Sequence, residues 1–213
     1  MNAPAYIVYI VDDDRNVCEA LCELLLSMDI YAVSFNSVAD YLAYPKVDIP
    51  GCLILDVELP DSNGLEFQQQ IVAEHHPPIV FITGHGDVPS SVTAIKRGAV
   101  DFLIKPFSEA DLVAAINAAV ALHIDLRRSR AEIAALQQRL ARLTPRERDV
   151  LPLVVSGLLN KQAAAELGIS EVTLQIHRSN VMQKMEAASL ADLVRISERL
   201  QIPVTHSRRV GSA

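Results

Sequence analysis

Hydrophobic and polar residues alternate along the first 122 residues in a pattern that predicts strands and helices in turn. Short apolar runs bounded by turn formers are typical of strands buried on both faces. Between them, apolar residues recur every three or four positions, which indicates amphipathic helices. The predicted strands are residues 6–11, 31–35, 53–56, 78–83 and 101–104, and the predicted helices are residues 17–28, 37–44, 65–75, 88–97 and 108–123.

Five such alternations favour right-handed crossovers and a doubly wound parallel sheet of five strands, an α/β fold. The carboxyl ends of its strands lie along one edge, where open α/β folds place their ligands. The residues at or just past the strand ends are polar: Asp12, Asp13, Asp56, Thr83 and Lys105. An isolated acid after a strand is more often a helix cap, but these five residues could converge on one site.

The rest of the chain has only helical patterns. Residues 123–143 form a charged stretch, in which Ile133, Leu136, Leu140 and Leu143 follow at the intervals of a coiled coil. Two interpretations remain open for this linker. It is either a helix that pairs with a second copy of the chain, or a solvated helix that packs one stripe of side chains on its own chain.

Four short helices are predicted in residues 144–205, a small all-α domain, before a disordered tail at 206–213. Thr144-Pro145-Arg146-Glu147 combines an N-cap, a proline at the first helical position and a capping box. The following helices are predicted to start at Asn160, Ser170 and Ser189, each as an N-cap. A short helix, a tight turn and a longer helix form a helix-turn-helix arrangement.

Charge and composition extend this division. Residues 1–122 carry 17 acidic and 5 basic side chains, a net charge of −12, whereas residues 123–213 carry 9 and 14, a net of +5. A basic second part suits a polyanion and an acidic first part suits a cation. No apolar run approaches the ~18 residues that span a bilayer, and the start lacks the features of a signal peptide, so we expect a cytoplasmic protein without membrane contact. Three cysteines without metal-site spacing favour free thiols.

The residues at the strand ends point to a particular chemistry. Carboxylates that face one another repel unless a cation lies among them, and oxygen ligands suit Mg²⁺. A lysine and a hydroxyl group beside them could hold the oxygens of a phosphoryl group. A carboxylate nucleophile would then yield an aspartyl phosphate.

Residues 5–122 resemble a response-regulator receiver domain, a flavodoxin- or CheY-like fold, through Asp12-Asp13, Asp56, Thr83-Gly84 and Lys105-Pro106. The resemblance implies that Asp56 accepts phosphate from a sensor histidine kinase. It further implies that Asp12, Asp13, Asp56 and the backbone carbonyl of Glu58 bind Mg²⁺, that Thr83 and Lys105 hold the phosphoryl group, and that Phe102 is the switch aromatic. Leu59-Pro60-Asp61 departs from the usual Met-Pro-Gly, and Glu58 adds an acid beside the site.

Residues 142–202 resemble the LuxR/FixJ-type DNA-binding domain. The similarity runs through Leu143-Thr144-Pro145-Arg146-Glu147, Gly157 to Lys161, Leu167-Gly168-Ile169-Ser170 and His177-Arg178. It implies that Gln175, Ile176 and Ser179 face base edges. The residues that it implies as phosphate contacts are Asn160, Lys161, Thr173, His177, Arg178 and Lys184. For His177, a packing or capping role inside the helix bundle is the alternative. Gln175 replaces a common lysine, and glutamine can pair with adenine.

Together these resemblances predict a two-component transcriptional regulator of the FixJ/NarL family that phosphorylation controls. Its expected partners are a sensor histidine kinase, double-stranded promoter DNA, RNA polymerase and a second copy of the chain on activation. The receiver would assist only the transfer to its own Asp56 and would not otherwise be an enzyme. A haloacid-dehalogenase-type phosphatase is the rival enzyme, but Asp56-Val57-Glu58-Leu59-Pro60 lacks its threonine. The other alternative is an RNA- or protein-binding role for the helical domain.

Overall fold

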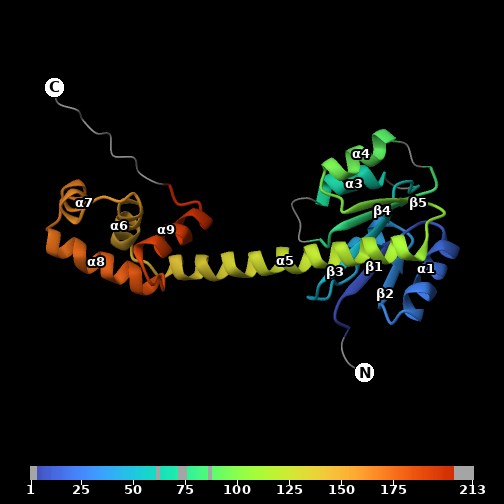
Figure 1. Cartoon of the computed structure of the whole chain (residues 1–213), viewed down its shortest axis with the longest axis horizontal. Coiled ribbons are helices and arrows are strands. Elements are labelled where there is room, and N and C mark those ends of the chain that lie inside the picture. Colours follow the sequence, from blue (N-terminus) through green and yellow to red (C-terminus); the bar gives the residue numbers. More distant parts are fainter. Residues whose placement is uncertain (1–3, 61–62, 72–75, 86–87, 204–213) are drawn as a thin grey trace. The chain divides into compact units, whose positions relative to one another are not determined.

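The computed structural model of the chain describes residues 4–60, 63–71, 76–85 and 88–203. The chain divides into two compact units, residues 1–127 and 128–213, which are described in turn (Figure 1). Among the described residues, no helix combines the length and the apolar character needed to cross a membrane. The predictions for Asp61, for the helix end at 72–75 and for the tail lie outside the described residues.

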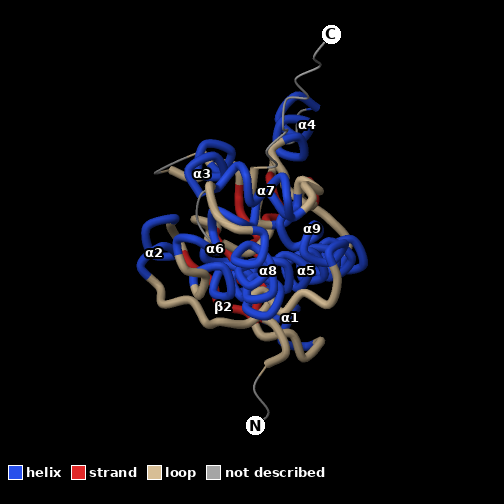
Figure 2. The backbone as a smooth tube through the Cα atoms, turned by 90° about the vertical axis from the view of Figure 1, so that its left-hand side faces the viewer, coloured by secondary structure: helices blue, strands red, loops and turns tan. Residues whose placement is uncertain are grey.

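The first unit is built on one parallel sheet of five strands in the order β2-β1-β3-β4-β5, coloured red in Figure 2. Val11 pairs with Leu55, Asp56 with Ile82 and Thr83 with Ile104, so the carboxyl ends of four strands lie side by side. The strands are β1 (Ile7–Val11), β2 (Ala32–Phe35), β3 (Gly51–Asp56), β4 (Ile79–Thr83) and β5 (Asp101–Ile104).

Five helices belong to the chain segments of this sheet, and side-chain alternation along the strands explains how they cover it. In β1, Val8 and Ile10 point to a core that α1 and α5 complete with residues such as Leu25 and Ile116. Ile7, Tyr9 and Val11 point to the opposite core, formed with α2, α3 and α4. The predicted doubly wound sheet is therefore confirmed. The helices are α1 (Arg15–Ser27), α2 (Val38–Ala43), α3 (Gly64–Ile71), α4 (Val88–Lys96) and α5 (Glu109–Ala141).

The second unit is entirely helical within its described residues, and its helix starts follow the sequence signals. Thr144 caps the first helix: its hydroxyl accepts from the N–H of Glu147 at 3.3 Å, and its own N–H donates to Glu147 Oε2 at 2.8 Å. Ser170 and Ser189 cap their helices as predicted. Gly168 ends its helix with φ +64°, a conformation that favours glycine. The helices are α6 (Pro145–Val155), α7 (Asn160–Leu167), α8 (Glu171–Lys184) and α9 (Leu190–Arg199).

The structure corrects one predicted helix end and one predicted N-cap. The helix expected to end near His123 continues to Ala141, because the residues after His123 include no glycine, proline or capping residue that would end it. Asn160 is the first residue of α7 and not its cap. Leu159 precedes the helix, and its N–H donates to Gln162 Oε1 at 3.0 Å, so the side chain of Asn160 remains available for another partner.

The linker stripe on α5 packs on its own chain in its second half. Leu136 on α5 and Leu143, two residues after the end of α5, are buried in the core of the second unit, and Leu140 packs against it. Ile133 is half-buried, and Leu126 is exposed. These three leucines therefore pack on their own chain, as one of the two interpretations of the linker predicts.

Candidate functional site

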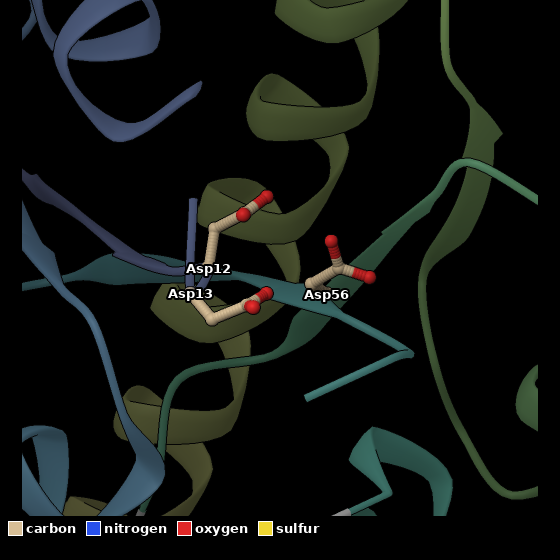
Figure 3. Close-up of side chains that lie close together, drawn as sticks. All are labelled: Asp12, Asp13 and Asp56. Carbon is tan, nitrogen blue, oxygen red and sulfur yellow. The ribbon is translucent and has the colours of Figure 1, made fainter. Parts of the chain in front are cut away.

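Three aspartates lie together at the carboxyl edge of the sheet and form the acidic cluster (Figure 3). Asp12 and Asp13 follow β1, and Asp56 is the last residue of β3. One carboxylate oxygen of each lies within 4.8 Å of the others. Asp12 and Asp56 are buried, with 1% and 6% of their surface exposed, whereas Asp13 is exposed. The cluster thus opens toward solvent on the side of Asp13.

Lys105, just after β5, forms ion pairs with two members of this cluster. Its Nζ lies 2.6 Å from Asp12 Oδ2 and 2.7 Å from Asp56 Oδ2. Burial alone lowers the pKa of Lys105, but the hydrogen bonds to the two carboxylates outweigh it and raise the pKa above its ordinary value. Lys105 is therefore protonated at neutral pH, and it compensates a close pair of negative charges that would otherwise repel.

Burial raises the pKa of Asp12 above its ordinary value, against the lowering effect of hydrogen bonds from Lys105 and from the backbone of Asp14. The charge of Asp56 adds to the upward shift. Asp12 Oδ1 accepts the Asp14 N–H at 3.0 Å, and Asp56 Oδ1 accepts the Glu58 N–H at 3.0 Å. In each carboxylate, Oδ1 thus accepts a hydrogen bond from a backbone N–H and Oδ2 accepts one from Lys105 Nζ.

Gly64 keeps the chain close to Asp56. Its N–H donates to the carbonyl of Val57 at 2.9 Å. A Cβ atom at this position would lie 2.4 Å from the backbone carbonyl oxygen of Asp56 and 3.2 Å from the ring of Phe81. Only glycine permits this approach, so the first residue of α3 contributes to the position of Asp56 itself.

Thr83 and Phe102 lie on neighbouring strands. Thr83 is buried at the end of β4, where its Oγ1 donates to the carbonyl of His85 at 3.2 Å and accepts the His85 N–H at 3.1 Å. The ring of Phe102 in β5 is half-buried, 6.2 Å from the ring of Phe81. The exposed side chains of Glu58 and His85 approach each other at 3.5 Å. The structure thus brings Asp12, Asp13, Asp56 and Lys105 into direct proximity and leaves Thr83 bonded to its own loop.

The predicted DNA contacts of the second unit fall into two groups. Gln175, Ile176 and Ser179 are exposed on one side of α8, as their spacing of three and four residues predicts. Among the predicted phosphate contacts, Lys161 is exposed and the others are partly buried. Arg178 Nη1 donates to Asn160 Oδ1 at 2.8 Å, which joins two of these residues, on α8 and α7.

Lys184, a third predicted phosphate contact, has a different partner. Its Nζ lies 2.6 Å from Oε2 of the buried Glu147. Burial raises the pKa of Glu147, but hydrogen bonds from Lys184 and from Thr144 lower it to about 2 overall. Lys184 therefore stabilises the fold of the second unit, a role that the sequence did not predict because the two residues lie 37 positions apart.

His177 and Thr173 also make contacts within the domain. His177 Nδ1 is buried without a hydrogen-bond partner among the described residues. This burial agrees better with a packing role than with a phosphate contact for this edge of the ring. Thr173 Oγ1 lies 2.8 Å from Ser170 Oγ at the start of α8. Val172 is exposed on the same side of α8 as Ile176, but it is not among the residues predicted from the sequence to face base edges. Its spacing of four residues from Ile176 could have revealed this position.

Comparisons with known proteins agree with this arrangement. Residues 8–117 match the response regulator receiver domain, and residues 141–197 match the bacterial regulatory proteins of the luxR family. Nodulation protein W of Bradyrhizobium diazoefficiens is 44% identical over 204 residues, which are 95% of this chain and 90% of that protein. The response regulator protein TodT of Pseudomonas putida is 45% identical over 202 residues, 94% of this chain and 89% of that protein.

Two solved structures resemble the chain over nearly its full length. The response regulator StyR is 43% identical, with a TM-score of 0.76 over 92% of this chain and 99% of that chain. Full-length FixJ from B. japonicum is 38% identical, with a TM-score of 0.56 over 94% of this chain and 100% of that chain. The chain therefore belongs to the response-regulator family, and it is a transcriptional regulator that joins a receiver domain to a LuxR-type DNA-binding domain.

Proposed function

We propose that a sensor histidine kinase transfers a phosphoryl group to Asp56, and that this modification controls promoter binding by the second unit. The observation that carries the proposal is the contact of one lysine with two buried carboxylates. Lys105 Nζ lies 2.6 Å from Asp12 and 2.7 Å from Asp56, with Asp13 beside them. Such a site pairs a nucleophile with fixed charges, which is what phosphoryl transfer requires.

In the transfer, a carboxylate oxygen of Asp56 forms a bond to phosphorus. The bond between phosphorus and the imidazole nitrogen of the kinase's phosphohistidine breaks, and the nitrogen keeps the electron pair. The histidine leaves as neutral imidazole once one ring nitrogen carries a proton. Lys105 already lies 2.7 Å from Asp56, so its positive charge is in place for the phosphoryl oxygens.

The acidic cluster has the donor set for Mg²⁺. Its carboxylate oxygens lie within 4.8 Å of one another, and oxygen donors with access to water are those that Mg²⁺ prefers. Asp12, Asp13, Asp56 and the backbone carbonyl of Glu58 would hold the ion. When bound, it would neutralise negative charge on the phosphoryl oxygens.

Thr83 and Phe102 would transmit the modification. The Thr83 hydroxyl now donates to the carbonyl of its own loop at 3.2 Å, and it would donate to a phosphoryl oxygen instead. Phe102 is half-buried, and its ring would follow. The arrangements of Thr83 and Phe102 before and after phosphorylation would be the two states of a switch. The phosphorylated state would shift the far face of the receiver, favour a homodimer and alter the availability of the DNA-binding domain.

In the cytoplasm, α8 would enter the major groove of promoter DNA, and the bound protein would have RNA polymerase as a partner. Gln175, Ile176 and Ser179 are exposed and would meet base edges, while residues such as Lys161 and Arg178 would meet phosphates. The remaining proposed phosphate contacts are Asn160, Thr173 and His177. Lys184 would contribute there only if it leaves Glu147. Two copies would bind half-sites about one helical turn apart.

The phosphorylation step is tested by intact-mass spectrometry after incubation with a phosphorylated histidine kinase domain and Mg²⁺. The wild type should gain one phosphoryl group, and Asp56→Asn should gain none. Glu19→Gln, at an exposed position on α1, serves as the control and should react like the wild type. Phosphorylation of Asp56→Asn to the same extent would reject Asp56 as the acceptor.

A further inference from the structure

The exposed side of α8, a helix that the structure describes throughout, carries no charged side chain between Val172 and Gln183. The exposed residues in this interval form the α8 strip, and they repeat at three- and four-residue intervals on one side of the helix. They are Val172, Gln175, Ile176, Ser179 and Gln183. Val172 is 70% exposed and Ile176 is 57% exposed, so two apolar side chains lie one turn apart on this side of the helix.

Val172 and Ile176 are not part of the core of the second unit. The apolar residues on the opposite side of α8, Leu174, Val181 and Met185, are all buried in that core. Positive charge lies elsewhere, at Lys161 in α7 and at the partly buried Arg178. Basic residues beside an uncharged strip match duplex DNA, in which phosphates flank the groove and base edges lie between them.

The chemistry of the α8 strip selects among base pairs. Guanine presents two acceptors in the major groove and is read most often by arginine or lysine, and the strip has neither. A glutamine amide pairs with N6 and N7 of adenine, and apolar side chains contact the methyl group of thymine. We propose that the strip reads A·T base pairs, with Gln175 on adenine and with Val172 and Ile176 on thymine methyl groups. This inference rests on the proposed DNA contacts of α8 and specifies their ligand.

The test uses the full-length protein with a small phosphoryl donor and Mg²⁺. Binding sites are selected from a pool of randomised duplexes, and affinities are measured by fluorescence anisotropy on a selected duplex. Deoxyuridine then replaces thymidine one position at a time, which removes only the methyl group. Loss of a contacted methyl should weaken binding about fourfold, because a buried CH₂ group is worth about 0.8 kcal/mol. The selected half-sites should contain A·T pairs at the positions that respond.

The double variant Val172→Ser/Ile176→Ser should bind thymidine and deoxyuridine duplexes equally, with an unchanged salt dependence because phosphate contacts remain. Leu26→Ser, at a 69% exposed position on α1, is the control and should keep the fourfold ratio. Three results would overturn this inference while DNA binding stands. The wild type could bind thymidine and deoxyuridine duplexes equally, the selected sites could contain no A·T pairs, or the double variant could keep the fourfold ratio. Absence of any duplex binding would overturn both.

Discussion

Lys105 is the residue on which the charge balance of the acidic cluster depends. Its ammonium group is the partner of both Asp12 Oδ2 and Asp56 Oδ2, at 2.6 and 2.7 Å, and the side chains of these two aspartates are nearly inaccessible to solvent. Removal of one partner from a buried ion pair leaves an uncompensated charge, which costs more than the pair itself contributes. The lysine also occupies oxygens that a metal ion would share.

Lys105→Met should therefore destabilise the metal-free protein by about 1–3 kcal/mol. It should also increase the stabilisation that Mg²⁺ gives against thermal unfolding. Thermal unfolding with and without Mg²⁺ measures both effects. Lys96→Met, at an exposed position on α4, is the matched control and should behave like the wild type. An equal stabilisation by Mg²⁺ in the Lys105 variant and the wild type would contradict this account of the site.

Gly64→Ala should damage the same site through the backbone. The new Cβ would lie 2.4 Å from the carbonyl oxygen of Asp56, a contact that cannot be relieved by a side-chain rotation. We expect a loss of about 1–3 kcal/mol in unfolding free energy and slower phosphorylation, because Asp56 must shift. Gly84→Ala is the control for stability, since a Cβ atom there would have no neighbour within 4 Å among the described residues. Equal denaturation midpoints for the two variants would show that the loop accommodates the methyl group.

Glu147 gives the second unit a pH dependence. Its pKa in the folded protein is about 2, below its ordinary 4.5. A carboxyl group whose pKa is lowered by folding contributes its full stabilisation above the unfolded pKa, and the contribution is lost as the pH falls through the folded pKa. The stability of the second unit should therefore decrease between about pH 4.5 and pH 2, as Glu147 becomes protonated and releases Lys184.

Glu147→Gln should flatten this part of the stability curve, as followed by helical circular dichroism during thermal unfolding. Glu166→Gln, at an exposed position on α7, is the control and should retain the wild-type slope. The comparison matters because other carboxylates also titrate in this range. If the slope is the same in both variants, the pair between Glu147 and Lys184 does not set the acid stability.

At the scale of elements, α5 serves two different cores along its length. Residues such as Leu112 and Ile116 pack on the sheet, whereas Leu136 and Leu140 pack among the helices of the second unit. Leu136→Ala should destabilise the second unit by about 2–4 kcal/mol without weakening the helix itself, since alanine is a good helix former. Leu126→Ala, where the side chain is 38% exposed, should change stability by less than about 0.5 kcal/mol.

Chemical unfolding followed by circular dichroism, together with light scattering, distinguishes packing from pairing. The packing account predicts lower stability of Leu136→Ala at an unchanged molecular mass. A loss of mass with little loss of stability would instead assign the leucine stripe to an interface between copies.

Elements with local signals could be predicted from the sequence, and contacts between distant elements could not. Ser170 and Ser189 cap helices as expected because an N-cap depends only on its own turn. The parallel arrangement also predicted that Asp12, Asp56 and Lys105 would meet. The partner of Lys184 and the continuation of α5 past His123 depend on tertiary packing or on the absence of a stop signal, which spacing alone does not reveal.

At the scale of the whole molecule, two chemically distinct units share one chain. Residues 1–122 have a net charge of −12 and contain the acidic cluster, whereas residues 123–213 have a net charge of +5 and contain α8. Proposed phosphorylation and proposed DNA contact are thus confined to different units. Regulation then requires that a charge added at Asp56 changes the affinity of the other unit for DNA, which is a coupling between two sites.

The most direct test measures the affinity of the full-length protein for a selected promoter-type duplex, with and without a phosphoryl donor and Mg²⁺. We predict that treatment tightens binding by the wild type about tenfold or more, in the usual range of coupling free energies, and leaves Asp56→Asn unchanged. The same affinity before and after phosphorylation of Asp56, or an equal response of the variant, would contradict the claim that this aspartate controls DNA binding.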